Sequence, residues 1–276
     1  DAQGGAAMAR PLLDDELWSV IEPLLPPPKP RRFKYPGRKP LDRRKALTGI
    51  LFVLKTGIPW EYLPQEMGCG CGMSCWRYLD AWQKAGVWEK VHKVLLDRLR
   101  AEEGIDLSAA VVDSSHVRAV GGAKNGSQPR GSKEKGVETH IITDAEGVPL
   151  AVRLTGGNRH DVTELIPLVD AIPPIAGKVG RPVRRPTEVY GDRAYDSDPH
   201  RKQLVQRGIQ PELAERNTEH GSGLGIFRWV VERTISWLHQ LRRLRVRYDR
   251  RDDIHLAFLT LGCIVICHRL LTNPFC

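Results

Sequence analysis

The sequence predicts an α/β fold in which a mixed β-sheet is flanked by helices and preceded by a small all-helical region. Residues 11–103 carry apolar side chains at helical spacing. From about residue 105, short β-branched runs alternate with helical patterns. Their order is strand, hairpin, helix, strand, helix, strand, helix, which places an antiparallel hairpin beside parallel crossovers, as a mixed sheet requires.

The helical region begins at LLDDELWSVIEPLL, where Asp14 or Asp15 stands near the start of a helix and Pro26-Pro27-Pro28 ends it. Further helices are expected in RRKALTGILFVLKTG, MSCWRYLDAWQKAG and WEKVHKVLLDRLRAEEG. The segment from Lys29 to Lys45 contains nine Lys or Arg and one Asp. Short helices beside a basic connector suit a helix-turn-helix-like DNA-binding module, and equally a helical cap with a solvated basic loop.

The second region supplies five expected strands: LSAAVVDSS, the two arms of VETHIITDAEGVPLAVRLT, TEVYGD and IQPELAE. The hairpin is expected to turn at Glu146-Gly147. Helices are expected in DVTELIPLVDAI, in SDPHRKQLVQRG, and over roughly 226–245 and 254–271. Ser197 would cap the helix in SDPHRKQLVQRG, and Gly208 would follow its end. The change of pattern predicts two domains, 11–104 and 105–276.

Length and charge narrow the possible functions. The 276 residues can bury a sizeable core, and 42 Lys and Arg against 33 Asp and Glu give a net charge of +9, which suggests a polyanionic partner. The apolar run LAFLTLGCIVICHRLL is shorter than the roughly 20 residues of a membrane span. The opening DAQGGAAMAR lacks the apolar core of a secretory signal, so we expect residues 1–10 to be a leader or remnant outside the fold.

The six cysteines are expected to stay reduced, because no secretory signal is evident. The cluster CGCGMSC, which holds Cys69, Cys71 and Cys75, could bind zinc. Its spacing is not that of a common zinc finger, and no nearby histidine completes it, so structural thiols are the preferred interpretation. Cys263 and Cys267 stand four residues apart on an apolar helix, as two small core residues would.

Three acidic residues occur in settings that fit one catalytic architecture. Asp113 closes the apolar run AAVVD, Asp192 follows TEVY, and Glu232 lies inside the helical pattern FRWVVERTISWL. Carboxylates from two strand ends and one helix can converge on a pair of divalent cations, as phosphoryl transfer on nucleic acid requires. Without a metal, such like charges would repel one another and raise the carboxyl pKa values.

The expected helix around Glu232 carries further polar groups on the same face. Arg228, Glu232, Ser236 and His239 are separated by four, four and three residues, so they lie above one another. Arg228 could pair with Glu232 or touch a phosphate. An ordinary surface Arg–Glu pair explains the same spacing.

These motifs together resemble a bacterial insertion-sequence transposase, with the insertion-sequence-five family of DDE transposases as the nearest group. The resemblance covers about 11–272 and is carried by GRKPLDRRKALTGILFVLKTGIPWEYLP, MSCWRYLDAWQKAGVW, VVDSSHVRA, ITDAEGVPLAVRLTGGNRHD, YGDRAYDS, RWVVERTISWLHQLRRLRVRYD and IHLAFLTLGCIVICHRLL. It implies an RNase H-like catalytic domain with Asp113, Asp192 and Glu232 as the metal-binding triad. In the family's Tyr, Arg, Glu, Lys signature, Arg228 and Glu232 match, whereas Gly225 and His239 stand at the Tyr and Lys places.

The resemblance also implies an activity and its partners. The protein would bind the terminal inverted repeats of its own element, with two Mg²⁺ ions (or Mn²⁺) in each active site. Metal-activated water would cut the DNA, and the freed 3′-hydroxyl would attack target DNA. Joining of two ends implies a homodimer or higher oligomer, acting in the bacterial cytoplasm in association with the nucleoid.

The expected DNA contacts are cations that would neutralise phosphates or touch the DNA end. They are Arg228, His239, Arg31, Arg32, Lys34, Arg38, Lys39, Arg43, Arg44, Lys45, Arg242, Arg243, Arg245 and Arg247. Trp60, Trp76, Trp82 and Trp229 could stack on flipped bases, although tryptophan at helical spacing is more often part of a core. Two alternatives stay open: a structure-selective nuclease of the same fold, and a catalytically silent DNA-binding protein derived from a transposase.

Overall fold

The structure is a computed structural model that describes residues 11–273 except 29, 31, 32, 36, 121–135, 158 and 217–224. The helices are α1 (Asp15–Ile21), α2 (Arg43–Thr56), α3 (Gly72–Lys84), α4 (Val87–Ala101), α5 (Val162–Asp170), α6 (Asp198–Gln206), α7 (Gly225–Gln240), α8 (Arg242–Arg245) and α9 (Asp252–Thr272). The strands are β1 (Ala109–Ala119), β2 (Gly136–Asp144), β3 (Pro149–Gly156), β4 (Glu188–Gly191), β5 (Gln210–Leu213) and β6 (Val246–Arg247). The expected leader lies outside the described residues.

The described part of the chain forms a six-stranded mixed sheet in the order β3-β2-β1-β4-β5, with β6 paired to the far end of β1. β1, β2 and β3 are antiparallel neighbours, whereas β4 and β5 run parallel to β1. This order and these directions are those of the RNase H-like fold. The five expected strands are confirmed, and the two-residue β6 is an addition that was too short for a sequence pattern to reveal.

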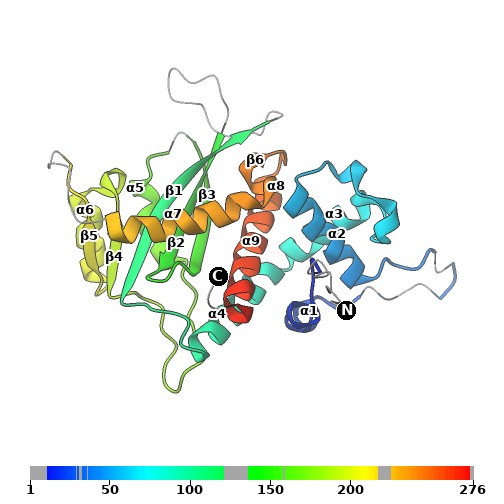
Figure 1. Ribbon diagram of the computed structural model, residues 1–276, viewed down its shortest axis with the longest axis horizontal. Coiled ribbons are helices and arrows are strands. Elements are labelled where there is room, and N and C mark those ends of the chain that lie inside the picture. The colour runs from blue at the N-terminus through cyan, green and yellow to red at the C-terminus, as the bar shows by residue number, and fades with distance from the viewer. Residues whose placement is uncertain are drawn as a thin grey trace, which may run out of the picture.

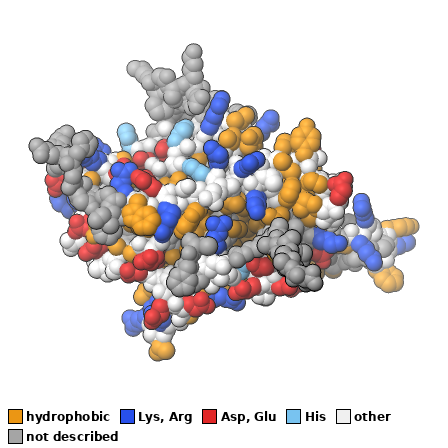
Figure 2. All heavy atoms as spheres, viewed as in Figure 1, with side chains coloured by type: hydrophobic (Ala, Val, Ile, Leu, Met, Phe, Trp, Pro, Cys, Tyr) orange, Lys and Arg blue, Asp and Glu red, His pale blue; other side chains and the backbone are white. Residues whose placement is uncertain are grey.

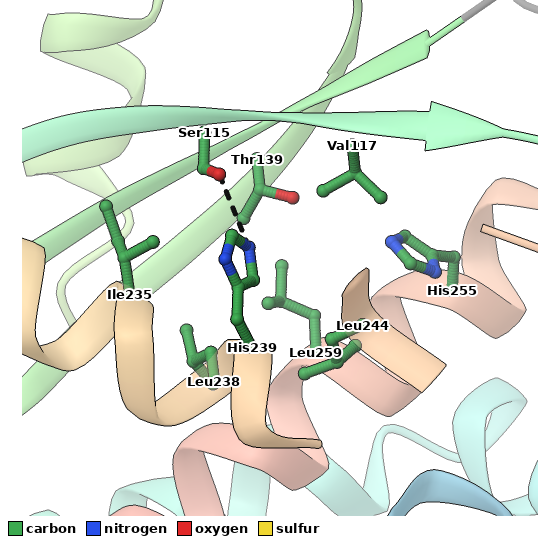
Figure 3. A pocket seen from close by; sticks show the side chains of 9 residues that line it. All are labelled: Ser115, Val117, Thr139, Ile235, Leu238, His239, Leu244, His255 and Leu259. Carbon is green, nitrogen blue, oxygen red and sulfur yellow. Dashed lines mark hydrogen bonds between the residues drawn. The ribbon is translucent and has the colours of Figure 1, made fainter. Parts of the chain in front are cut away.

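Helices cover both faces of the sheet (Figure 1). α7 lies across one face and packs on β1, β2 and β4, while α5 packs on β2 and β3 from the other side. Because side chains alternate along a strand, residues two apart on β1 share a face. Ser115 and Val117 point toward α7 (Figure 3), so Asp113 belongs to the face that α7 covers.

Three local predictions require correction. Asp113 lies in the middle of β1 rather than at its end, because β2 pairs with β1 as far as Arg118. The helix expected over 226–245 breaks at Leu241, which is extended (φ −82°, ψ 98°). Ser197 occupies the N-cap of α6, but its hydroxyl bonds the His200 ring (2.8 Å) instead of a helical N–H.

The N-terminal helices pack directly on the sheet region. α4 lies along α9 (Figure 1), and His92 Nε2 lies 2.8 Å from the Pro149 carbonyl oxygen of β3. One cluster of buried apolar side chains runs through both regions. Among the described residues, only α9, with 21 residues, has the length and hydropathy of a membrane span, yet 72% of its apolar window is buried. It is the central core helix.

Candidate functional site

The two aspartates lie level with each other on neighbouring strands. In the parallel pairing of β1 and β4, Val111 stands opposite Tyr190. Asp113 and Asp192 each follow two residues later, so both side chains are directed to the same face, with the strands about 4.8 Å apart. Asp192 comes directly after β4 and accepts a hydrogen bond from the Ala194 amide (2.9 Å).

The Asp113 carboxyl is half-buried and accepts a hydrogen bond from the Ser114 amide (2.8 Å). Burial raises its pKa to about 6, and the negative charges of Asp192 and Glu232 act in the same direction, while Arg228 opposes them. The three carboxylates therefore act on one another electrostatically, as expected of like charges brought together without a cation.

Glu232 reaches this site from α7, which covers the face that bears Asp113. Its Oε1 lies 3.1 Å from Nη2 of Arg228, one helical turn earlier, and both side chains are about half exposed. Within the described residues, no three His, Cys, Asp or Glu side chains are assembled closely enough to hold a metal ion. The carboxylates of Asp113, Asp192 and Glu232 supply the oxygen ligands that Mg²⁺ prefers, but the Glu232 carboxylate is paired with an arginine.

The β2–β3 turn holds one side of α7, which the sequence pattern did not indicate. Thr234 Oγ1 donates to the Gly147 carbonyl (2.7 Å), and the Arg233 guanidinium donates to the Glu146 carbonyl (2.5 Å). The same guanidinium lies against the rings of Trp229 and Trp237, 4.5 and 4.8 Å from their centroids. Gly147 has φ +90°, a conformation that residues other than glycine rarely adopt, and a Cβ there would also lie 2.9 Å from the Arg233 guanidinium and 3.0 Å from Thr234.

The other side of α7 meets β1 through His239. Its Nε2 lies 3.3 Å from Ser115 Oγ, and the ring points into a small pocket between the sheet, α7 and α9 (Figure 3). Burial and the nearby Arg245 lower the pKa of His239. In this structure the imidazole is turned into the protein, whereas a DNA contact requires a side chain directed to solvent.

The expected DNA-contacting cations differ in accessibility. Basic side chains are spread over the face that carries α7 (Figure 2). Those that are exposed are Lys34, Arg38, Lys39, Lys45, Arg228, Arg242 and Arg245; Arg43 and Arg44 are half-buried, and Arg31 and Arg32 lie outside the described residues. Arg43 donates to the Pro26 carbonyl (2.7 Å), and Arg44 pairs with Asp15.

Two of the expected DNA contacts are wrong. Arg243 is 5% exposed and pairs with Asp249 at 3.0 Å, while also donating to the Ile58 carbonyl. Arg247 has a fully buried side chain that pairs with Asp252. A buried cation needs carboxylate and carbonyl partners, and both guanidiniums have them. These contacts fix the α8–β6 segment against the rest of the protein.

Most of the tryptophans and cysteines are structural. Trp60 stacks on Phe258 and Trp82 packs against Trp88, whereas Trp229 is 50% exposed. The cysteines among the described residues are free thiols, and only Cys71 is exposed. Cys69 and Cys75 are buried, and the Cys75 thiol donates to the Cys69 carbonyl (3.2 Å), as structural thiols do.

Comparison with known proteins identifies the class. Residues 105–267 match the family described as "Transposase DDE domain", and residues 13–92 match a family of IS4/5 transposases. The chain is 57% identical over 157 residues to a Burkholderia cepacia protein named as the transposase of insertion sequence element IS402, covering 57% of this chain and 73% of that protein. It is 27% identical over 218 residues to the IS1106 transposase of Neisseria meningitidis serogroup B, covering 64% of this chain and 72% of that one.

Solved structures are more distant. A chain of the pre-cleavage Mos1 transpososome is 11% identical with a TM-score of 0.28, covering 84% of this chain and 80% of that chain. A chain of a simian T-cell lymphotropic virus intasome is 18% identical with a TM-score of 0.36, covering 56% of this chain and 48% of that one.

The fold and the site thus define a metal-dependent polynucleotidyl transferase. The chain belongs to the DDE transposase family, among the insertion-sequence transposases of the IS4/5 group. It is accordingly a DNA-binding enzyme of a family whose general activity is DNA strand cleavage and strand transfer with divalent metal.

Proposed function

We propose that this transposase cuts and joins DNA at the ends of its own insertion element, with Asp113, Asp192 and Glu232 as the metal ligands. The observation that carries the proposal is their placement. Asp113 lies on β1 and Asp192 directly after the neighbouring parallel strand β4, each two residues beyond the Val111–Tyr190 pair, and the glutamate lies on the helix that covers this face. The raised pKa of Asp113 supports it, since a buried carboxylate beside others is stabilised by a cation.

The metal would be Mg²⁺, with Mn²⁺ as a substitute and two ions per site. When bound, the ions supply Lewis-acid stabilisation of the attacking and leaving oxygens in an in-line displacement. Glu232 would hold the metal once it separates from Arg228, and the guanidinium would then be available to a DNA phosphate. An ion pair this exposed contributes at most about 1 kcal/mol, so its separation is easy.

The partners are the terminal inverted repeats and the target DNA. In this proposal residues 11–104 bind the ends, and residues 105–276 perform the chemistry. The exposed cations Lys34, Arg38, Lys39, Lys45, Arg242 and Arg245 contact phosphates. Two ends must be held together, so the active form is a homodimer or larger assembly, working on nucleoid DNA in the bacterial cytoplasm.

The test uses a labelled duplex that carries the inverted repeat flanking the coding sequence. We expect the unaltered protein to cut it with Mg²⁺ and to join a pre-cut 3′ end to target DNA. Asp113→Asn removes both activities while the protein stays folded, and the control Asp198→Asn, at an exposed position on α6, retains them. Unchanged cleavage by Asp113→Asn would contradict the site assignment. Cleavage without joining by the unaltered protein would instead support the nuclease alternative.

A further inference from the structure

We propose that Ser115 and His239 are positioning residues whose contact sets the place of Glu232 relative to Asp113, and thereby the affinity of the carboxylates for divalent cations. The inference rests on the proposed function of those carboxylates. It assigns His239 a role inside the protein, in place of the DNA contact that its position in the family signature suggests.

The strand side of this contact is adjacent to Asp113. Ser115 follows Asp113 by two residues on β1, so both side chains project from the same face about 7 Å apart. Ser115 is held in register, because β2 pairs with β1 on both sides of it, at Ser114 with His140 and at His116 with Glu138. The hydroxyl is therefore a fixed reference point beside the first aspartate.

The helix side has the matching relation to Glu232. His239 follows Glu232 by seven residues, which is two turns of α7, a rise of about 10 Å, on nearly the same face. An attachment at residue 239 consequently limits both rotation of α7 about its axis and sliding along it. The turn contacts of Thr234 and Arg233 hold the other side of the helix. The contact between His239 and Ser115 joins α7 to the strand that bears Asp113.

The surroundings of His239 favour this contact over a DNA contact. The pocket around the ring is lined by the apolar side chains of Ile235, Leu238, Leu244 and Leu259, and by the polar side chains of Thr139 and His255 (Figure 3). The free space there is about 10 Å³, enough for at most about one water molecule and far too little for a phosphate. A lysine ammonium would lose its hydration in such a site, whereas an imidazole with one polar partner fits it.

The experiment measures Mn²⁺ binding by the full chain without DNA, from the electron paramagnetic resonance signal of free Mn²⁺. We expect Ser115→Ala and His239→Leu to weaken Mn²⁺ binding roughly three- to tenfold, less than the ~10–100-fold typical of direct partners of metal ligands. His239→Gln restores binding to about the original value, because its amide nitrogen can take the place of Nε2. Ser236→Ala, an exposed hydroxyl one turn from Glu232, leaves binding unchanged.

A second measurement separates this role from a DNA contact. The salt dependence of duplex binding by His239→Leu should equal that of the unaltered protein, whereas loss of a phosphate contact would reduce the slope by about one. A reduced slope with unchanged Mn²⁺ affinity would overturn the inference, as would normal Mn²⁺ binding by Ser115→Ala. If the unaltered protein bound no Mn²⁺, that result would contradict the proposed metal site and, with it, this inference. Thermal melts check that each variant is folded. If His239→Leu does not fold, the test rests on Ser115→Ala, which removes only one oxygen atom.

Discussion

Arg228 Nη2 lies 3.1 Å from Glu232 Oε1, so the glutamate of the proposed catalytic triad is paired with the arginine one turn before it on α7. The pair is half exposed on both sides, which makes it a weak structural contact and an exchangeable one. Arg228 also lowers the pKa of Asp113 in opposition to Asp192 and Glu232. A single guanidinium thus partly neutralises the carboxylate site when no metal is present.

We expect Arg228→Gln to change function and not stability. The exposed ion pair contributes less than about 1 kcal/mol, so the melting temperature should shift by only a few degrees at most. Mn²⁺ should bind somewhat more tightly, because a competing cation has been removed, while affinity for the DNA end should fall. Calorimetric titration with Mn²⁺ and a duplex-binding assay check the two effects. Weaker Mn²⁺ binding in Arg228→Gln would contradict the competition.

Arg243→Ala should instead destabilise the protein by about 3–5 kcal/mol, because it leaves the 8%-exposed Asp249 without its partner. It also removes the bond to Ile58 that joins α8 to the end of α2. Chemical denaturation measures the change. The matched control Arg245→Ala, two residues away and exposed, should unfold at the same denaturant concentration as the unaltered protein. Equal stability of both variants would remove the structural role assigned to Arg243.

The basic connector gives a prediction about salt. Arg38 and Lys39 are exposed, and replacing both with alanine removes two candidate phosphate contacts. The slope of log affinity against log salt concentration should become shallower by about 2, with no change in melting temperature. Binding titrations between low and physiological salt measure the slope. The control is Lys90→Ala, an exposed cation of α4 outside the connector. An unchanged slope in the double variant would favour the helical cap with a solvated loop.

Acid should destabilise the contact between α4 and the sheet. Burial lowers the pKa of His92 to about 4, although its bond to the Pro149 carbonyl opposes the shift. As the pH falls, His92 is therefore protonated in the unfolded chain before it is protonated in the folded protein. The contribution of His92 to the free energy of unfolding is fully present above about pH 6.5 and is lost as the pH falls toward 4. The loss amounts to about 3 kcal/mol once the pH is below 4.

His92→Gln, which keeps a side-chain N–H donor, should remove this part of the acid sensitivity. Melting temperatures of both proteins at pH 7, 5.5 and 4.5 check it, since their difference should shrink or reverse on acidification. His160→Gln, at an exposed histidine, should follow the unaltered protein at each pH. If His92→Gln lost stability in parallel with the unaltered protein, another group would be responsible for the acid response.

Much of the fold could be predicted because its signals are local. The β-branched run before Asp113, the Glu146-Gly147 turn and the helix around Glu232 each depend on side-chain periodicity or turn chemistry within a few residues. The two-residue β6 and the break at Leu241 could not be predicted this way. They depend on the pairing of β6 with the end of β1 and on the bond from Arg243 to the Ile58 carbonyl, which are contacts between segments distant in the sequence.

The predictions about the site also separate into those that depend on local sequence and those that depend on tertiary packing. The sequence by itself determined which carboxylates are available and on which kind of element each lies, since residue type and local pattern suffice for that. Only the tertiary structure decided that Asp113 stands in mid-strand, that Asp192 follows the neighbouring parallel strand, and that His239 turns inward to Ser115. Strand register, helix rotation and burial are settled by packing across the whole chain, and they determine whether a charged side chain meets solvent, a partner or a metal.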